Sequence, residues 1–161
     1  MKKRKVFRII AIIGIAGLLV GGGIGLYMFN KPHRDVQSAQ ADYVLTSSQI
    51  VAEYLTDYQA ANQKYLAADG NSKILEISGE VSEISENFNG QKVVLLYGVK
   101  DRAGVSAIFT AETNDNLNGI KVGRKITVKG VIRSGASYDE DLEMYENVIL
   151  EKSDIVKEEN N

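Results

Sequence analysis

The chain has 161 residues, of which 44% are hydrophobic and 25% charged, and its formal net charge is −2. It contains no cysteine, which excludes disulfides, thiolate metal sites and acylation of a lipoprotein cysteine. Its only histidine is His33, so no histidine follows residue 45. A domain formed by the later residues cannot contain a Ser-His or Cys-His catalytic pair, and the chain cannot form a metal site with several histidine ligands.

The first 29 residues have the pattern of a membrane anchor. An uncharged apolar run over residues 9–29 is long enough to cross a bilayer as a helix, because each residue adds roughly 1.5 Å. A cleaved secretory signal is the alternative, but it needs a shorter apolar segment of about 7 to 15 residues. We therefore predict a basic cytosolic segment over residues 1–8 and an uncleaved transmembrane helix over residues 9–29, which would bind the lipid bilayer. Five cations precede that helix: Lys2, Lys3, Arg4, Lys5 and Arg8.

The distribution of cations predicts the orientation of this anchor. Lys and Arg near the ends of a membrane helix resist translocation, and five lie before the apolar run against Lys31 and Arg34 after it. The N-terminus is therefore expected in the cytosol, and the rest of this single-pass protein outside it, in the periplasm or envelope of a bacterial source. Without the five leading cations, 14 Lys and Arg face 21 Asp and Glu. An acidic exported domain disfavours nucleic acid, whose phosphates are bound by clustered cations.

Glycines within the apolar run offer a dimerisation face. Gly17, Gly21 and Gly25 are four residues apart and would lie on one side of the helix, where a second helix could approach closely. They would then support a homodimer. The alternative is that they reflect the general frequency of glycine in membrane helices.

A tether and a helix are expected after the anchor. Residues 30–45 carry several charges without apolar periodicity, which indicates a tether. Thr46 and Gln49 fit a capping box, in which each side chain binds a free backbone N–H at the start of a helix. Apolar residues then recur three and four positions apart over residues 50–66. They predict one amphipathic helix of about five turns that ends near Gly70.

The apolar period changes to two after residue 73, as is typical of strands. Gly79 and Gly130 fall inside the first and fourth strands, where a bulge or bend would let each strand curl. A loop or a single helical turn around Leu117 interrupts the series. Five strands are expected, over residues 73–86, 93–97, 105–110, 125–132 and 148–151.

These five strands match a small five-stranded Greek-key barrel, with the preceding helix over one open end. The predicted fold class is α+β and mainly β: an N-terminal transmembrane helix, then an amphipathic helix packed on the barrel. The barrel domain with its helix would cover residues 46–156. Residues 157–161 would form a charged, frayed tail.

Three stretches of the sequence resemble the tRNA-anti-like OB-fold family. They begin at Leu45 (LTSSQIVAEY), Lys73 (KILEISGEV) and Gly119 (GIKVGRKITVKG), and the likeness covers about residues 43–156. The resemblance implies an OB-fold barrel and an envelope protein. It also implies nucleic-acid binding by analogy of fold, although this chain has no lipid-accepting cysteine and an acidic barrel.

The resemblance also implies where a ligand would bind. OB-folds place ligands on strands two and three, between the loop joining strands one and two and the loop joining strands four and five. Stacking of a ligand requires exposed aromatic rings backed by cations. The ligand-binding candidates are Asn87, Phe88, Tyr97, Arg133 and Tyr138.

No catalytic or metal motif supports an enzyme or a cofactor. Asn114, Asn116, Asn118 and Gly119 imitate the start of a calcium loop, but Lys125 occupies the place of its closing Glu. The expected function is a binding or assembly module for a protein partner or envelope component. The alternative is an oligonucleotide- or oligosaccharide-binding protein that uses the barrel face. A positive aromatic groove would favour the alternative, whereas an exposed apolar patch or an open strand edge would favour the first.

Overall fold

The computed structural model describes residues 35–157. The predicted transmembrane helix over residues 9–29, with its face of Gly17, Gly21 and Gly25, lies outside the described residues, as do the basic segment and the end of the tail. Among the residues that are described, no helix is both long enough and apolar enough to cross a bilayer.

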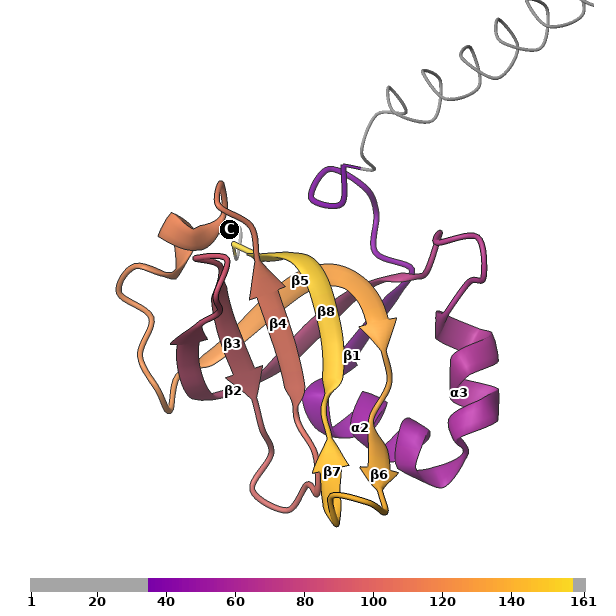
Figure 1. The fold of residues 1–161 in the computed structure, drawn as a ribbon. Coiled ribbons are helices and arrows are strands. Elements are labelled where there is room, and N and C mark those ends of the chain that lie inside the picture. Colours follow the sequence, from indigo (N-terminus) through magenta and orange to yellow (C-terminus); the bar gives the residue numbers. More distant parts are fainter. Residues whose placement is uncertain (1–34, 158–161) are drawn as a thin grey trace, which may run out of the picture. The chain divides into compact units, whose positions relative to one another are not determined.

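Five strands close into the barrel, in the order β2-β3-β4-β8-β5 and back to β2 (Figure 1). The pair β4 and β8 is parallel, and the other four pairs are antiparallel. This closure is the OB-fold order, and it confirms the predicted mainly β barrel. The strands are β2 (Ile74–Glu86), β3 (Lys92–Leu96), β4 (Val105–Phe109), β5 (Lys125–Ser134) and β8 (Val148–Ile155).

The long strand β2 bends because it pairs with β5 through its first half and with β3 through its second. A bulge or a bend was expected at Gly79; the bulge lies between Val81 and Glu83, where the β2–β3 register shifts. Gly79 has a different role. A Cβ atom there would lie 2.8 Å from Ser47 Oγ and 3.0 Å from Leu96 Cβ, so the absence of a side chain lets the first helix approach the sheet.

The first helix, α2 (Ser47–Thr56), starts at the predicted capping box. The Gln49 backbone N–H donates to Thr46 Oγ1 at 3.2 Å, and the Thr46 N–H donates to Gln49 Oε1 at 2.8 Å. Two backbone donors at the helix start are thereby satisfied.

The single five-turn helix expected from the apolar stripe is wrong, because two helices share that stripe. α2 ends at Thr56, and α3 (Tyr58–Tyr65) follows. Asp57 between them has an extended backbone, with φ −149° and ψ 92°. Its carboxylate accepts the Ala60 N–H at 3.0 Å and so caps α3. One short acidic side chain stops the helix and starts a new one.

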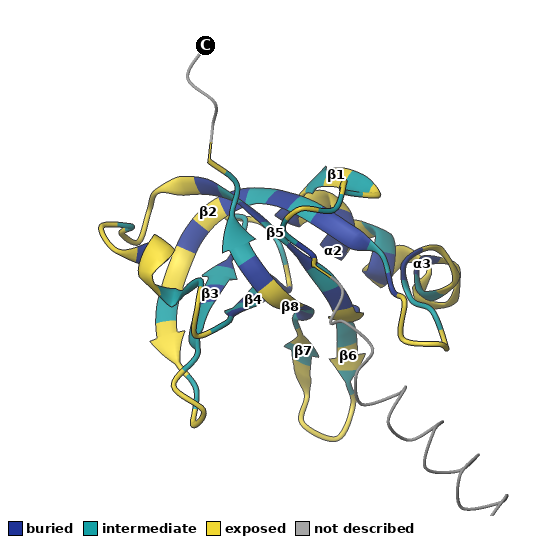
Figure 2. Ribbon diagram, turned by 90° about the horizontal axis from the view of Figure 1, so that it is seen from above, coloured by how far each residue is buried: buried dark blue, intermediate teal, exposed yellow. Residues whose placement is uncertain are grey.

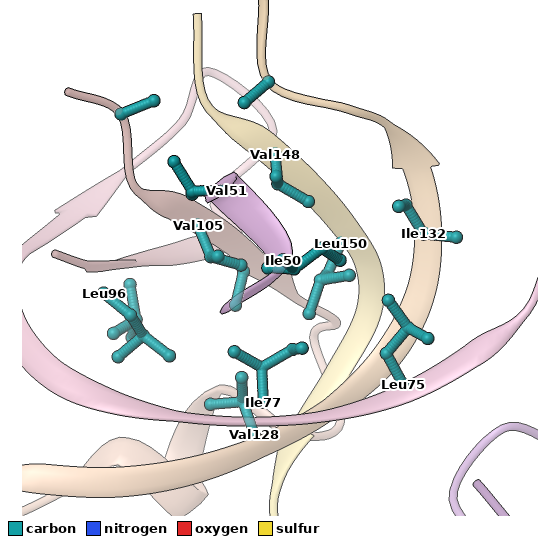
Figure 3. Close-up of a cluster of buried hydrophobic side chains, with 14 of the residues drawn as sticks. Ile50, Val51, Leu75, Ile77, Leu96, Val105, Val128, Ile132, Val148 and Leu150 are labelled. Carbon is teal, nitrogen blue, oxygen red and sulfur yellow. The ribbon is translucent and has the colours of Figure 1, made fainter. Parts of the chain in front are cut away.

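Helix α2 packs its apolar face into the interior of the barrel. Ile50, Val51 and Tyr54 are at most 2% exposed and belong to the same buried cluster as the inward side chains of the strands. Figure 3 shows Ile50 and Val51 among the barrel residues. Those residues are Leu75, Ile77, Leu96, Val105, Val128, Ile132, Val148 and Leu150.

The domain begins earlier than predicted. Residues 35–45 were expected to belong to a tether, but Val36 is 3% exposed and β1 (Tyr43–Thr46) pairs in parallel with β2. Gln37 Nε2 also donates to the Lys152 carbonyl at 2.7 Å. These contacts join residues far apart in the sequence, so local periodicity does not reveal them.

The segment between the predicted strands 125–132 and 148–151 contains a hairpin that the sequence analysis did not predict. Its strands are β6 (Ser137–Asp139) and β7 (Met144–Glu146), and its tip is exposed (Figure 2). The expected helical turn around Leu117 is present as a 3₁₀ helix, η1 (Asn114–Leu117).

We expect Asp57→Ala to lower the free energy of unfolding by about 1 kcal/mol, because α3 loses its N-cap. Asp57→Asn, which keeps an acceptor, should remain within a few tenths of a kcal/mol of the parent. Urea unfolding followed by circular dichroism measures both. If the two helices were instead continuous, Asp57→Ala would raise stability, because alanine has the better helix propensity.

Candidate functional site

The structure separates the predicted ligand-binding residues along β3. Asn87 and Phe88 lie in the turn before this strand, and Phe88 is fully exposed. The turn is tied to η1, since Asn114 Nδ2 donates to the Gly90 carbonyl at 2.9 Å. Tyr97 directly follows the other end of β3 and is partly buried. The turn therefore lies at the opposite end of β3 from Tyr97 (Figure 1).

The remaining two candidates, Arg133 and Tyr138, lie near the end of β5 and in β6. Arg133 is exposed, and its Nε is 3.8 Å from Glu151 Oε1 in a surface ion pair. Tyr138 lies in β6 with 49% of its surface exposed. Among the described residues, no contact joins Tyr138 to the β2–β3 turn. A site at Tyr138 must therefore consist of other residues.

Tyr138 lines a cavity of about 400 Å³ between the helices and the β6–β7 hairpin. We call this cavity the tyrosine pocket. Its volume suits one large side chain or a small cyclic ligand. Its lining residues are Tyr54, Leu55, Tyr58, Arg102, Ala136, Ser137, Tyr138 and Tyr145.

Aromatic pairs form two walls of the tyrosine pocket. On the helix side, the rings of Tyr54 and Tyr58 are 5.8 Å apart and inclined at 60°. On the hairpin side, the rings of Tyr138 and Tyr145 are 4.9 Å apart. Tyr58 and Tyr138 remain about half exposed, at 45% and 49%. The pocket therefore presents ring surface from both walls to an incoming apolar or planar group.

One cation belongs to the tyrosine pocket. Arg102, in the loop between β3 and β4, donates from Nη1 to the Tyr145 hydroxyl at 2.9 Å. Its guanidinium carbon is also 5.8 Å from the centre of the Tyr145 ring, within the range of a cation–π contact. The contact holds Arg102 at the pocket and orients Tyr145.

The hairpin that forms one wall of the pocket is rich in carboxylates. Its tip and strands carry five acidic residues, four of them exposed, and none of the five lines the pocket itself. Such a hairpin repels phosphate and attracts basic groups. The five are Asp139, Glu140, Asp141, Glu143 and Glu146.

Tyr54 forms the floor of the pocket and is 1% exposed. Burial, reinforced by the neighbouring Tyr58 and Tyr65, raises the pKa of the Tyr54 hydroxyl well above its ordinary value, so it stays neutral. Gly135 lies directly against the ring, because a Cβ atom there would overlap ring carbons of Tyr54. This contact fixes the hairpin to α2.

The pocket includes residues that sequence reasoning placed elsewhere. Tyr54 and Tyr58 were assigned to the apolar stripe of a helix, and Tyr145 and Arg102 were not considered. The paired tyrosines on either side of the acidic tip, Tyr138 and Tyr145, are the signal in the sequence that could have indicated a hairpin with an aromatic face.

A second groove, between α2 and α3, is occupied by its own polar network. Lys64 Nζ and the Tyr65 hydroxyl each donate to Glu53 Oε2 at 2.8 Å. The hydrogen bond from Lys64 is the main cause of a lowered pKa of Glu53. These groups satisfy one another's hydrogen bonds, so we infer that the network holds α2 and α3 together. Among residues 35–157, no three His, Asp or Glu side chains gather closely enough to hold a metal ion.

Comparison with known proteins identifies a family and a fold. A family model described as tRNA_anti-like matches residues 1–141. No curated protein sequence matches the chain. A solved structure from Klebsiella pneumoniae, described as a "putative nucleic acid-binding lipoprotein", is 18% identical with a TM-score of 0.52. The match covers 78% of this chain and 99% of that one, and at this identity it shows a common fold.

We expect Gly135→Ala to destabilise the domain by about 1 to 3 kcal/mol, because the added methyl group overlaps the Tyr54 ring. The loss should shrink in a Tyr54→Leu background, where the smaller side chain leaves room. Thermal unfolding of the four variants of this cycle measures the coupling, with Ser134→Ala as a neighbouring control. An equal loss in both backgrounds would contradict the proposed contact.

Proposed function

The chain belongs to the tRNA_anti-like family, and from that premise we propose that it is a membrane-anchored binding module of the cell envelope. Residues 9–29 would anchor it, with the N-terminus in the cytosol and the OB-fold barrel outside. The tyrosine pocket would dock a protein partner or another envelope component. The observation that carries this proposal is an exposed, aromatic pocket formed in part by a hairpin that carries five acidic residues.

The pocket supports a particular kind of partner. Binding energy at protein interfaces concentrates in apolar or aromatic anchors that enter a pocket. Tyr58 and Tyr138 offer ring surface to such an anchor, and exposed Leu142 and Met144 extend the apolar surface along the hairpin. The carboxylates of the hairpin would favour basic residues beside the anchor. We therefore expect a partner segment with one large apolar side chain flanked by Lys or Arg.

We also propose that the pocket binds its ligand without transforming it. Its polar groups are tyrosine hydroxyls, Ser137 and Arg102. The pKa of Tyr54 is raised, which makes this hydroxyl a poor general base at neutral pH.

An oligonucleotide or oligosaccharide ligand is the second candidate. Arg102 beside Tyr145 offers a stacking surface with a cation, which suits the bases of single-stranded nucleic acid. The fold shared with the Klebsiella protein, itself described as a "putative nucleic acid-binding lipoprotein", adds support by analogy. The acidic hairpin opposes a phosphate backbone but not a neutral sugar, so an oligosaccharide is the better fit of the two.

Photo-crosslinking tests the docking function in its membrane. We replace Tyr138 with p-benzoylphenylalanine in the full chain and irradiate intact envelopes. A discrete protein adduct is expected, and Tyr58→Ala should abolish it by removing the opposite wall. The matched control is the same replacement at Phe88, which is fully exposed in the turn between β2 and β3, and it should give no such adduct.

Two results would contradict the protein-docking proposal. Adducts that form equally from positions 88 and 138 would indicate random collision. An adduct with oligonucleotide or glycan at position 138, sensitive to Tyr58→Ala, would establish the second candidate instead.

The membrane topology has its own test, for which the absence of native cysteine is useful. Val99→Cys, at a position that is 96% exposed, should react with a membrane-impermeant maleimide in intact spheroplasts. Lys3→Cys should react only after lysis, because the basic segment stays in the cytosol. The reverse pattern, or release of the chain by alkaline carbonate, would contradict the anchor.

A further inference from the structure

A second cavity lies on the outer surface of the barrel and is cationic. It has a volume of about 570 Å³, and its charged lining residues are Arg124, Lys125 and Lys157. The hydroxyls of Ser78 and Thr127, 2.7 Å apart, add two polar groups. We call this cavity the cationic pocket. Among the described residues, no carboxylate lines it, although the whole chain has more acids than bases.

The cations of this pocket have no ion-pair partner among the described residues. Across residues 35–157, none of Arg124, Lys125 and Lys157 forms an ion pair, whereas Lys64, Lys73, Lys129 and Arg133 all do. Glu80 is the cross-strand neighbour of Lys125, and no ion pair forms between them. Three cations that form no ion pair among the described residues, placed around two hydroxyls, can bind the oxygens of a phosphate group.

The turn that enters the pocket combines positive charge with an exposed apolar tip. Val122 is 63% exposed and lies between Lys121 and Arg124. The turn is held in place on β2, because the Gly123 N–H donates to the Val81 carbonyl at 2.7 Å and the Arg124 carbonyl accepts the Val81 N–H at 2.9 Å. A fixed apolar tip flanked by cations suits the boundary between lipid headgroups and acyl chains.

The same face of the barrel contacts the beginning of the described chain. Lys125, Thr127 and Lys129 alternate along the outer side of β5, and Lys129 Nζ donates to the Gln37 carbonyl at 3.2 Å. The described residues begin at Asp35, and five residues, 30–34, separate it from the end of the predicted span. An extended chain covers at most about 3.6 Å per residue, so only a short stretch of chain, roughly 20 Å when extended, separates the predicted span from Asp35.

From these observations we propose that the cationic pocket binds the phosphate of an acidic phospholipid in the membrane that anchors the chain. The inference rests on the proposed anchor. Arg124, Lys125 and Lys157 hold the phosphate, and Val122 enters the headgroup region. Docking here fixes the orientation of the barrel and leaves the tyrosine pocket, at the far end of β5, open to a partner.

Fluorescence quenching in the full chain tests this proposal. Val122→Cys is labelled with an environment-sensitive fluorophore, and the chain is reconstituted into nanodiscs that contain a nitroxide-headgroup lipid. Strong quenching is expected with phosphatidylglycerol present and weak quenching with phosphatidylcholine alone. High salt should remove the difference, because it screens the attraction. Label at Leu142→Cys, on the hairpin, should be unquenched in both lipids.

Charge variants give the matched control. Arg124→Gln with Lys125→Gln should lower the docked fraction about tenfold or more, since each cation near an acidic membrane strengthens binding. Lys100→Gln with Arg133→Gln removes the same charge away from the pocket and should leave quenching unchanged. Circular dichroism confirms that both variants are folded.

Several outcomes would overturn the proposal. Equal quenching in both lipids, or quenching unaffected by Arg124→Gln with Lys125→Gln, would refute lipid binding by this pocket. A shift of the label with inorganic phosphate or a short oligonucleotide, without quenching in acidic discs, would assign the pocket to a soluble anion or to nucleic acid. A chain that fails to insert into discs at all would refute the anchor, and with it both proposals.

Discussion

The packing of α2 into the barrel is the interaction on which the rest of the domain depends. A five-stranded barrel has an interior that its own side chains must fill. Ile50 and Val51 supply apolar volume from outside the sheet and are buried with the strands. Gly79 permits the approach, since any side chain there would meet Ser47 at the start of the helix. Helix and barrel therefore form one hydrophobic cluster.

That packing also creates the tyrosine pocket. Tyr54 belongs to the buried cluster through its ring and to the pocket as its floor. The hairpin is held against the same ring through Gly135, so both walls of the pocket are positioned by one side chain. Because a rigid scaffold positions them, Tyr58 and Tyr138 can remain half exposed without losing their geometry.

Charge is segregated on the domain in a way that suits two different contacts. The hairpin that forms one wall of the aromatic pocket concentrates carboxylates, whereas the start of β5 and the segment after β8 carry cations that form no ion pair among residues 35–157. Over distances longer than about 10 Å, salt screens one charge cluster from the other. Each end can thus attract a ligand of opposite sign: basic groups at the tyrosine pocket and phosphate at the cationic pocket.

The sequence by itself determined the barrel strands, the capping box at Thr46 and the turn around Leu117, because each depends on neighbours within a few residues. It also predicted a membrane anchor, which the described residues do not include. Only the tertiary structure decided the break at Asp57, since the apolar stripe continues across it. The same holds for β1 and for the tyrosine pocket, whose contacts join Tyr54, Arg102 and Tyr138 across long separations. Periodicity reports which face of an element is buried, but not which distant element buries it.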